Sequence, residues 1–169
     1  CPNLVIIPPD YSLYMQCSTA LMNLLNEYSP LLERYSIDEC FLDITEAVGN
    51  EDPVNFAHEI SNKVKKTLGF TVNIGVSTNK LLAKMGSELE KPDKVHSMFR
   101  HEIPKKMWPL SVKELFMVGR RTAPKLYRLN IFSIGQLAHA DPEFLTAHFK
   151  SFGKVLWRYA NGIDDSPVN

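Results

Sequence analysis

Two adjacent acidic residues, Asp38 and Glu39, are the side chains whose type and spacing best suit chemistry. They lie within Tyr-Ser-Ile-Asp-Glu-Cys-Phe-Leu-Asp-Ile, residues 35–44, between two short apolar segments. Like charges held close together raise each other's pKa, and a divalent cation relieves that repulsion. Hard carboxylate oxygens are the ligands that Mg²⁺ prefers, so one interpretation of the pair is a magnesium site.

A solvated hairpin tip with two idle acids explains the same residues. Neighbouring residues on a regular strand point to opposite faces, so Asp38 and Glu39 can share a metal only if the chain turns there. The connection Ile37-Asp38-Glu39 is short enough to permit a turn. From the local sequence both interpretations stay open.

The elements around this pair are predicted to alternate between strands and helices. Strands are expected at about 4–7, 31–36, 40–45 and 70–76, and helices at about 10–28, 52–68 and 79–90. Asp52 followed by Pro53 is typical of a helix start, and Gly69 of a helix end. The order predicts an α+β fold with helices on one face of a mixed or antiparallel sheet.

The character of the sequence changes after about Met98, where strand patterns give way to short capped helices. Ser133 with Gln136 forms a capping box, and Asp141 with Pro142 predicts another helix start. We therefore expect one domain over 1–98, a small all-helical domain over 99–165, and the start of a linker over 166–169.

A short pattern occurs twice in the helical part, as Val118-Gly119-Arg120 and as Phe152-Gly153-Lys154. A glycine with positive φ, unpaired N–H groups at the start of the following helix and an adjacent cation together suit a phosphate. The repeat indicates a tandem helix-hairpin-helix that grips a nucleic-acid backbone without reading its sequence. Two ordinary glycine turns would produce the same repeated pattern.

Charge is divided along the chain although the total is neutral. Residues 1–60 carry a net charge of −9 and residues 61–169 a net charge of +9, which often accompanies an anionic partner. The three cysteines match no zinc spacing and no disulfide framework, which favours reduced thiols in a cytosolic protein. No apolar stretch is long enough to cross a membrane, so a membrane partner is not expected.

Residues 35–44 closely resemble the palm motif of the Y-family DNA polymerases, the DinB/UmuC group. The resemblance continues in the family's order along essentially the whole chain. The matching segments are Val76-Ser77-Thr78-Asn79-Lys80-Leu81-Leu82-Ala83-Lys84 with Glu90-Lys91-Pro92, then 118–123 with 130–135, and finally 160–168. The resemblance implies part of a palm domain followed by a helix-hairpin-helix thumb.

The resemblance also implies roles for individual residues. Asp38 and Glu39 would be catalytic ligands of Mg²⁺ in a two-metal site, whose chemistry is nucleotidyl transfer. Lys91 and Lys84 would bind the incoming nucleotide. The residues implied for DNA binding are Lys80, Gly119, Arg120, Arg121, Thr122, Lys125, Gly153 and Lys154. Met117 stands where the first hairpin usually has glycine.

The family begins with a strand carrying another catalytic Asp and with the fingers, to which nothing here corresponds. We therefore expect an internal fragment of an error-prone translesion DNA polymerase, with an incomplete metal site and no activity of its own. The expected partners are primer-template DNA, deoxynucleoside triphosphates and a sliding clamp reached through other regions, in the bacterial cytoplasm near the nucleoid. The alternatives are a non-enzymatic DNA-binding module and, less favoured, a metal-dependent nuclease.

Overall fold

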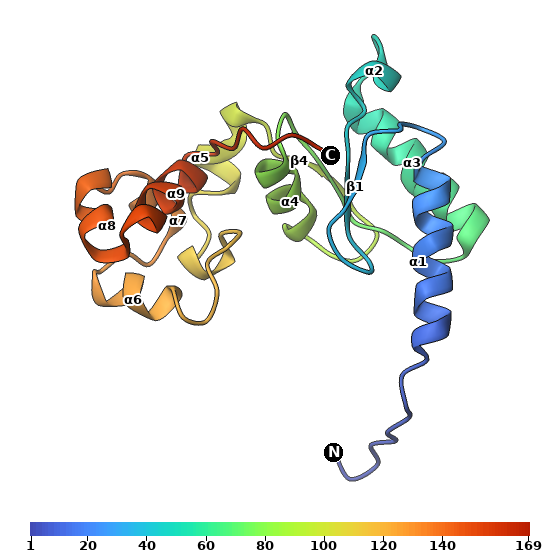
Figure 1. The fold of residues 1–169 in the computed structure, drawn as a ribbon, viewed down its shortest axis with the longest axis horizontal. Coiled ribbons are helices and arrows are strands. Elements are labelled where there is room, and N and C mark those ends of the chain that lie inside the picture. Colours follow the sequence, from blue (N-terminus) through green and yellow to red (C-terminus); the bar gives the residue numbers. More distant parts are fainter.

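The computed structural model describes residues 1–169 as two parts joined side by side (Figure 1). Strands occur only in the first part, and short helices make up the second. The elements are α1 Tyr11–Leu25, β1 Leu32–Arg34, β2 Cys40–Leu42, α2 Thr45–Val48, α3 Pro53–Leu68, β3 Ile74–Val76, α4 Lys80–Glu88, β4 Val95–Ser97, η1 Arg100–Glu102, α5 Ile103–Lys106, η2 Val112–Glu114, α6 Ala123–Arg128, α7 Ile134–Ala138, α8 Pro142–Phe149 and α9 Ser151–Ala160.

The strands form two short two-stranded sheets. β1 and β2 are antiparallel, with Glu33 opposite Phe41, and β3 and β4 are parallel, with Gly75 opposite His96. Helices α1 and α3 pack on one side of the strands through a core that includes Leu25, Ile60 and Val64, while α4 lies on the other side of β3 (Figure 1). The α+β class is confirmed.

Local signals in the sequence give most helix boundaries correctly. The Asp10 carboxylate accepts the N–H of Leu13 at the start of α1, and Asp52 does the same for α3. Gly69 ends α3 with φ of +76°, a conformation that glycine adopts without steric cost. These caps depend on neighbours within a few residues, which is why sequence alone locates them.

The strand predictions were less accurate. Residues 4–7 are apolar but form no strand; they belong to an extended N-terminal arm and are 65–84% exposed (Figure 1). A strand needs a partner edge for its N–H and C=O groups, and the arm has none in this structure. β3 covers only Ile74–Val76 of the predicted 70–76, and β4 was missed because Val95–Ser97 is too short to show alternation.

A second core, made of 18 buried residues, runs from Leu81 in α4 to Ala160 in α9. Leu81, Leu82 and Met85 of α4 belong to it, as does Met98 directly after β4, so the first part of the chain contributes directly to the core of the helical part. The boundary near Met98 coincides with the end of the last strand but stays a prediction. No helix here has the length and apolar character needed to cross a membrane.

Candidate functional site

The connection between β1 and β2 turns sharply at the acidic pair. The carbonyl of Glu39 accepts the N–H groups of both Tyr35 and Ser36, which closes the loop. The hydroxyl of Ser36 donates to Oδ1 of Asp38 at 2.7 Å. Because the chain turns here, Asp38 and Glu39 both line one cleft, as a shared site requires.

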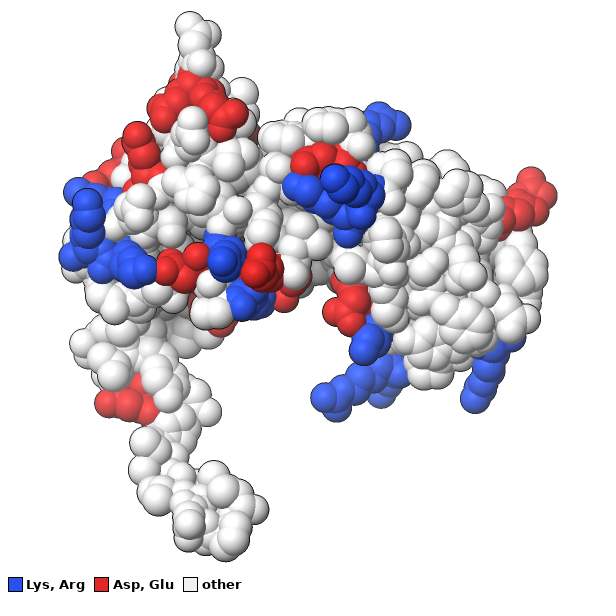
Figure 2. Space-filling view, turned by 180° about the vertical axis from the view of Figure 1, so that it is seen from behind, with Lys and Arg blue, Asp and Glu red and all other residues white.

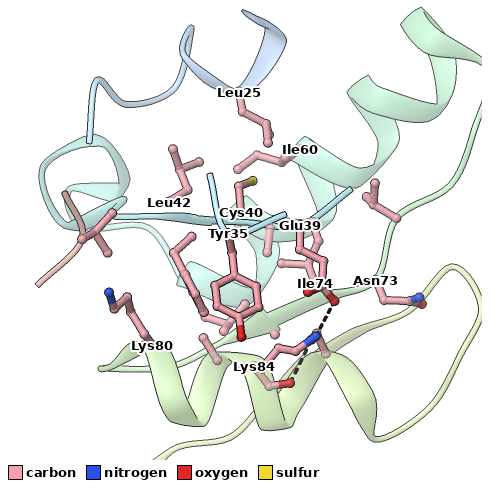
Figure 3. Close-up of a pocket in the computed structure, with 18 of the residues that line it drawn as sticks. Leu25, Tyr35, Glu39, Cys40, Leu42, Ile60, Asn73, Ile74, Lys80 and Lys84 are labelled. Atoms are coloured by element: carbon pink, nitrogen blue, oxygen red, sulfur yellow. Dashed lines mark hydrogen bonds and ion pairs between the residues drawn. The ribbon is translucent and has the colours of Figure 1, made fainter. Parts of the chain in front are cut away.

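That cleft has a volume of about 990 Å³ and lies between the two sheets. Its inner wall is apolar and includes Leu25 and Ile60, whereas Glu39 and Lys84 lie on its polar side (Figure 3). Apolar walls with a few convergent charged groups are typical of ligand sites. The charged groups come from the β1–β2 loop and from α4, which face each other across the cleft.

A chain of ion pairs connects three of the predicted site residues. Lys84 donates a hydrogen bond to Oε1 of Glu39 (Figure 3). It donates another, at 2.9 Å, to Oε1 of Glu88. Lys91 pairs with the other oxygen of Glu88 at 2.8 Å. Partial burial disfavours the charge on Lys84, but the two carboxylates outweigh it and raise the pKa of its ammonium. Lys84 therefore stays cationic at the wall of the cleft.

Lys80 lies on the same helix but is directed to a different partner. Its ammonium donates to both oxygens of Glu33, at 3.0 and 2.9 Å, and lies 5.5 Å from the centre of the Phe41 ring. The hydrogen bond from Lys80 holds the pKa of Glu33 below its usual value. Lys80 and Lys84 thus border the same cleft, with separate acidic partners.

The residues present do not complete a metal site by themselves. Asp38 and Glu39 provide suitable oxygen donors, but the 169 described residues contain no group of three or more His, Cys, Asp or Glu side chains placed to hold an ion. Burial raises the pKa of the nearby Cys40 thiol to about 11, so the thiol is uncharged near neutral pH in the metal-free protein.

The first predicted phosphate loop, Gly119 to Arg121, is exposed and precedes α6. None of these three residues donates its backbone N–H within the chain, while the Gly119 carbonyl accepts from Thr122 and Ala123. Glycine was expected to supply the positive φ here, and that expectation was wrong. Met117 has φ of +72° instead, two residues earlier. The loop is therefore exposed, has two arginines, and has three N–H groups without a partner in the chain.

The second predicted loop is not a loop. Gly153 and Lys154 lie inside α9, which begins at Ser151, and the N–H of Gly153 already donates to Lys150. A Cβ on Gly153 would lie 2.4 Å from the carbonyl oxygen of Leu145 in α8. The glycine is needed for close packing of α8 against α9 rather than for a turn, and the positive φ belongs to Lys150.

The remaining basic side chains of the proposed DNA contact lie on the outside of the helical part. Arg120, Arg121, Lys125 and Lys154 are exposed. Figure 2 shows Lys and Arg side chains projecting from the helical lobe beside the hollow that separates the two lobes. The sequence predicted these residues as a group, and the structure places them on the surface without assigning a ligand to them.

Comparison with known proteins decides the family. The impB/mucB/samB family matches residues 1–88. The chain belongs to this family. DNA polymerase IV of Clostridium acetobutylicum is 52% identical over all of this chain and 43% of its own length, and DNA polymerase IV 1 of Bacillus subtilis is 38% identical over 41% of its length. The chain thus spans about two fifths of these relatives.

Solved structures of Y-family and DinB polymerases share the fold. DinB from Sulfolobus solfataricus superposes with a TM-score of 0.88 at 26% identity, over 99% of this chain and 50% of that one. An insertion ternary complex of Dbh DNA polymerase gives the same TM-score and identity, over 99% of this chain and 50% of its own. The resemblance to the Y-family is confirmed by these structures and by a Y-family polymerase chimera.

Several polar residues of this impB/mucB/samB chain were missed by sequence reasoning. Glu88 pairs with both Lys84 and Lys91, Glu33 with Lys80, and Asp164 with the backbone of α4. Only Glu88 had a signal, because it lies four residues after Lys84 and so on the same helical face. The other two contacts join segments 47 and 83 residues apart.

Proposed function

We propose that this chain is the part of an error-prone translesion DNA polymerase that holds two catalytic carboxylates and a DNA-gripping thumb. The activity is template-directed nucleotidyl transfer, with primer-template DNA and deoxynucleoside triphosphates as substrates, in the cytoplasm. The observation that carries the proposal is the turn that brings Asp38 and Glu39 into one cleft, opposite the cationic Lys84.

In this proposal Asp38 and Glu39 are ligands of catalytic Mg²⁺. Their oxygens are of the right kind, and Mg²⁺ is commonly bound by one or two carboxylates, with water and substrate phosphate oxygens as the other ligands. When bound, the ion supplies charge neutralisation for the reacting phosphate oxygens.

The cations around the cleft would hold the triphosphate. Lys84 and Lys91 both pair with Glu88, and Lys84 also pairs with Glu39, so each already has an acidic partner. An incoming triphosphate would compete for these ammonium groups, since charge-assisted hydrogen bonds to phosphate are strong. Lys80, held by Glu33, would stay at the border of the cleft and face the DNA backbone.

The thumb would hold the primer strand through phosphates. Gly119, Arg120 and Arg121 offer three unpaired N–H groups and two guanidinium groups, and Lys125 adds another exposed cation on α6. Such contacts position a duplex without reading its sequence. Thr122 and Lys154 would make secondary contacts with the phosphates. Gly153 would make none, because its N–H already donates to the carbonyl of Lys150.

A primer-extension assay tests the function. We expect the full-length polymerase that contains this chain to add nucleotides to a primed template with Mg²⁺, and the isolated residues 1–169 to show none above background. DNA binding without extension by the full-length protein would support a non-enzymatic binding module instead. Strand cleavage without extension would support a nuclease.

A further inference from the structure

The segment that follows α9, at the end of the helical part, is hydrogen-bonded to the start of α4 in the first part of the molecule. The side-chain amide of Asn79 donates to the carbonyl of Gly162 at 3.0 Å. The N–H of Leu81 donates to Oδ2 of Asp164 at 3.2 Å. Both bonds span 83 residues, so they join the end of the helical part to the helix that carries Lys84.

The contact is closely packed as well as hydrogen-bonded. Gly162 has φ of +70°, and a Cβ there would lie 2.3 Å from Cδ1 of Ile103 and 3.2 Å from Cδ2 of Leu82. A side chain at this position would be both strained and obstructed. The chain therefore leaves α9 in one direction, directly against the first turn of α4.

Asp164 suits this position chemically. The first N–H groups of a helix have no partner within the helix, and a carboxylate there is favoured by the helix dipole. Asn79 caps Leu82, and Asp164 takes the neighbouring N–H of Leu81. The other oxygen of Asp164 accepts both the N–H and the hydroxyl of Ser166, which fixes the carboxylate's orientation.

The same segment then runs along the cleft. Residues 164–168 line it, and the N–H of Asn169 donates to Oε2 of Glu33 at 3.1 Å, the carboxylate that also holds Lys80. In Figure 1 the red C-terminal segment leaves α9 and passes α4 on its way toward the β1 side. The latch, defined as residues 162–169, thus contacts both walls of the cleft.

We propose that Asp164 is a positioning residue that, together with the apolar core shared by α4 and the helical part, fixes the orientation of the helical part relative to α4. Through it, the exposed loop Gly119–Arg121 and the cations Lys80 and Lys84 are held in fixed positions relative to each other. The catalytic consequence rests on the proposed function: a primer gripped by the thumb would then present its end at a constant place relative to Glu39. The latch itself is a property of these residues alone.

Nuclear magnetic resonance of residues 1–169 tests the latch with three variants. Asp164→Ala removes the acceptor, and Asp164→Asn keeps an oxygen in nearly the same place. Asp165→Ala is the matched control, because its side chain is 83% exposed and only pairs with Arg158. Two quantities are measured: the exchange rate of the Leu81 amide, and the relative orientation of α3 and α9 from residual dipolar couplings.

In Asp164→Ala we expect the Leu81 amide to exchange at least about tenfold faster, which corresponds to about 1.4 kcal/mol. The residual dipolar couplings of α3 and α9 should then no longer fit a single alignment tensor. Asp164→Asn should stay within about threefold of the parent, and Asp165→Ala should not change. An unchanged orientation in Asp164→Ala, or an equal change in Asp165→Ala, would overturn the proposal.

Failure of the latch and failure of the proposed function are distinguishable. The exchange rate and the couplings are measured without DNA or nucleotide, so they report on Asp164 whatever the protein binds. If the latch holds but the full-length protein does not extend primers, the polymerase assignment fails and the latch stands. If extension occurs but α3 and α9 keep their alignment in Asp164→Ala, only the latch is refuted.

Discussion

The ammonium of Lys84 donates a hydrogen bond to the carboxylate of Glu39, which lies 45 residues earlier in the chain. From the sequence, a divalent cation was expected to relieve the repulsion between Asp38 and Glu39. In the structure, Lys84 compensates Glu39, and the Ser36 hydroxyl donates to Asp38. The pair is therefore compatible with a stable fold in the absence of metal.

Lys84→Met tests how much this ion pair contributes. The substitution keeps most of the apolar stem but leaves Glu39 and Glu88 without their shared partner, so we expect the free energy of unfolding to fall by about 1 kcal/mol. Denaturant unfolding at low salt measures it. Lys66→Met, on exposed α3 surface and without an ion pair, should change stability by less than about 0.5 kcal/mol. Equal effects of the two substitutions would contradict the role of Lys84.

The ionisation of Glu102 should make the stability of the folded protein depend on pH. Burial works against its charge, but Lys106, the N–H of Phe99 and the hydroxyl of Ser97 outweigh burial and lower the pKa of Glu102 to about 2. A lowered folded-state pKa gives stability that is present above the unfolded-state value near 4.5 and lost as pH falls toward 2.

Glu102→Gln should accordingly cost about 1–2 kcal/mol at pH 7, and much less at pH 2.5. Thermal unfolding at the two pH values measures the difference. Glu114→Gln is the control, because Glu114 is exposed and its nearest cation, Lys113, is 3.6 Å away. A cost for Glu102→Gln that does not depend on pH would show that its charge is not the cause.

Alanine substitutions at Gly153 and Gly119 should have very different effects on stability. Gly153→Ala pushes a methyl group toward the Leu145 carbonyl and should destabilise the protein by about 2–3 kcal/mol. Gly119→Ala meets no atom within 4 Å and no positive φ, so it should change stability by less than about 0.5 kcal/mol. Denaturant unfolding compares them. If Gly119→Ala were the more damaging substitution, the packing account of Gly153 would be wrong.

DNA binding by residues 1–169 should depend strongly on salt. Each phosphate contact that is lost lowers the slope of log affinity against log salt by about 0.9. We expect Arg120→Ala with Arg121→Ala to flatten the slope by about 1–2, measured by fluorescence anisotropy with a labelled duplex. Lys63→Ala with Lys66→Ala removes the same charge from α3 and should leave the slope unchanged. Equal flattening by both pairs would place the contact elsewhere.

The sequence predicted those features that depend on neighbours along the chain. The caps at Asp52 and Asp141, the stop at Gly69 and the capping box at Ser133 are all present. The order of the expected strands and helices predicted the α+β class, and the resemblance to the Y-family predicted the family. In each case a few adjacent residues, or an ordered set of motifs, contain the information.

Features that depend on contacts between distant segments were not predicted. Residues 4–7 have strand-like composition but no partner edge, and Gly153 looked like a turn because its contact with Leu145 is invisible in the sequence. The pairing of Lys80 with Glu33 and of Asp164 with Leu81 requires the tertiary fold. Positive φ at Met117 was missed because a non-glycine residue adopts it.

The rate of nucleotide addition by the full-length protein, which we propose to be a polymerase, tests the central claim most directly. Asp38→Asn and Glu39→Gln nearly preserve size and remove a proposed metal-ligand charge, and Glu46→Gln on exposed α2 is the matched control. We predict that each of the first two lowers the single-turnover rate by about 10²-fold or more, roughly 3 kcal/mol in the transition state. Duplex binding should be unchanged, and Glu46→Gln should keep the normal rate. Rates within about threefold of wild type for both Asp38→Asn and Glu39→Gln would contradict the assignment of these carboxylates.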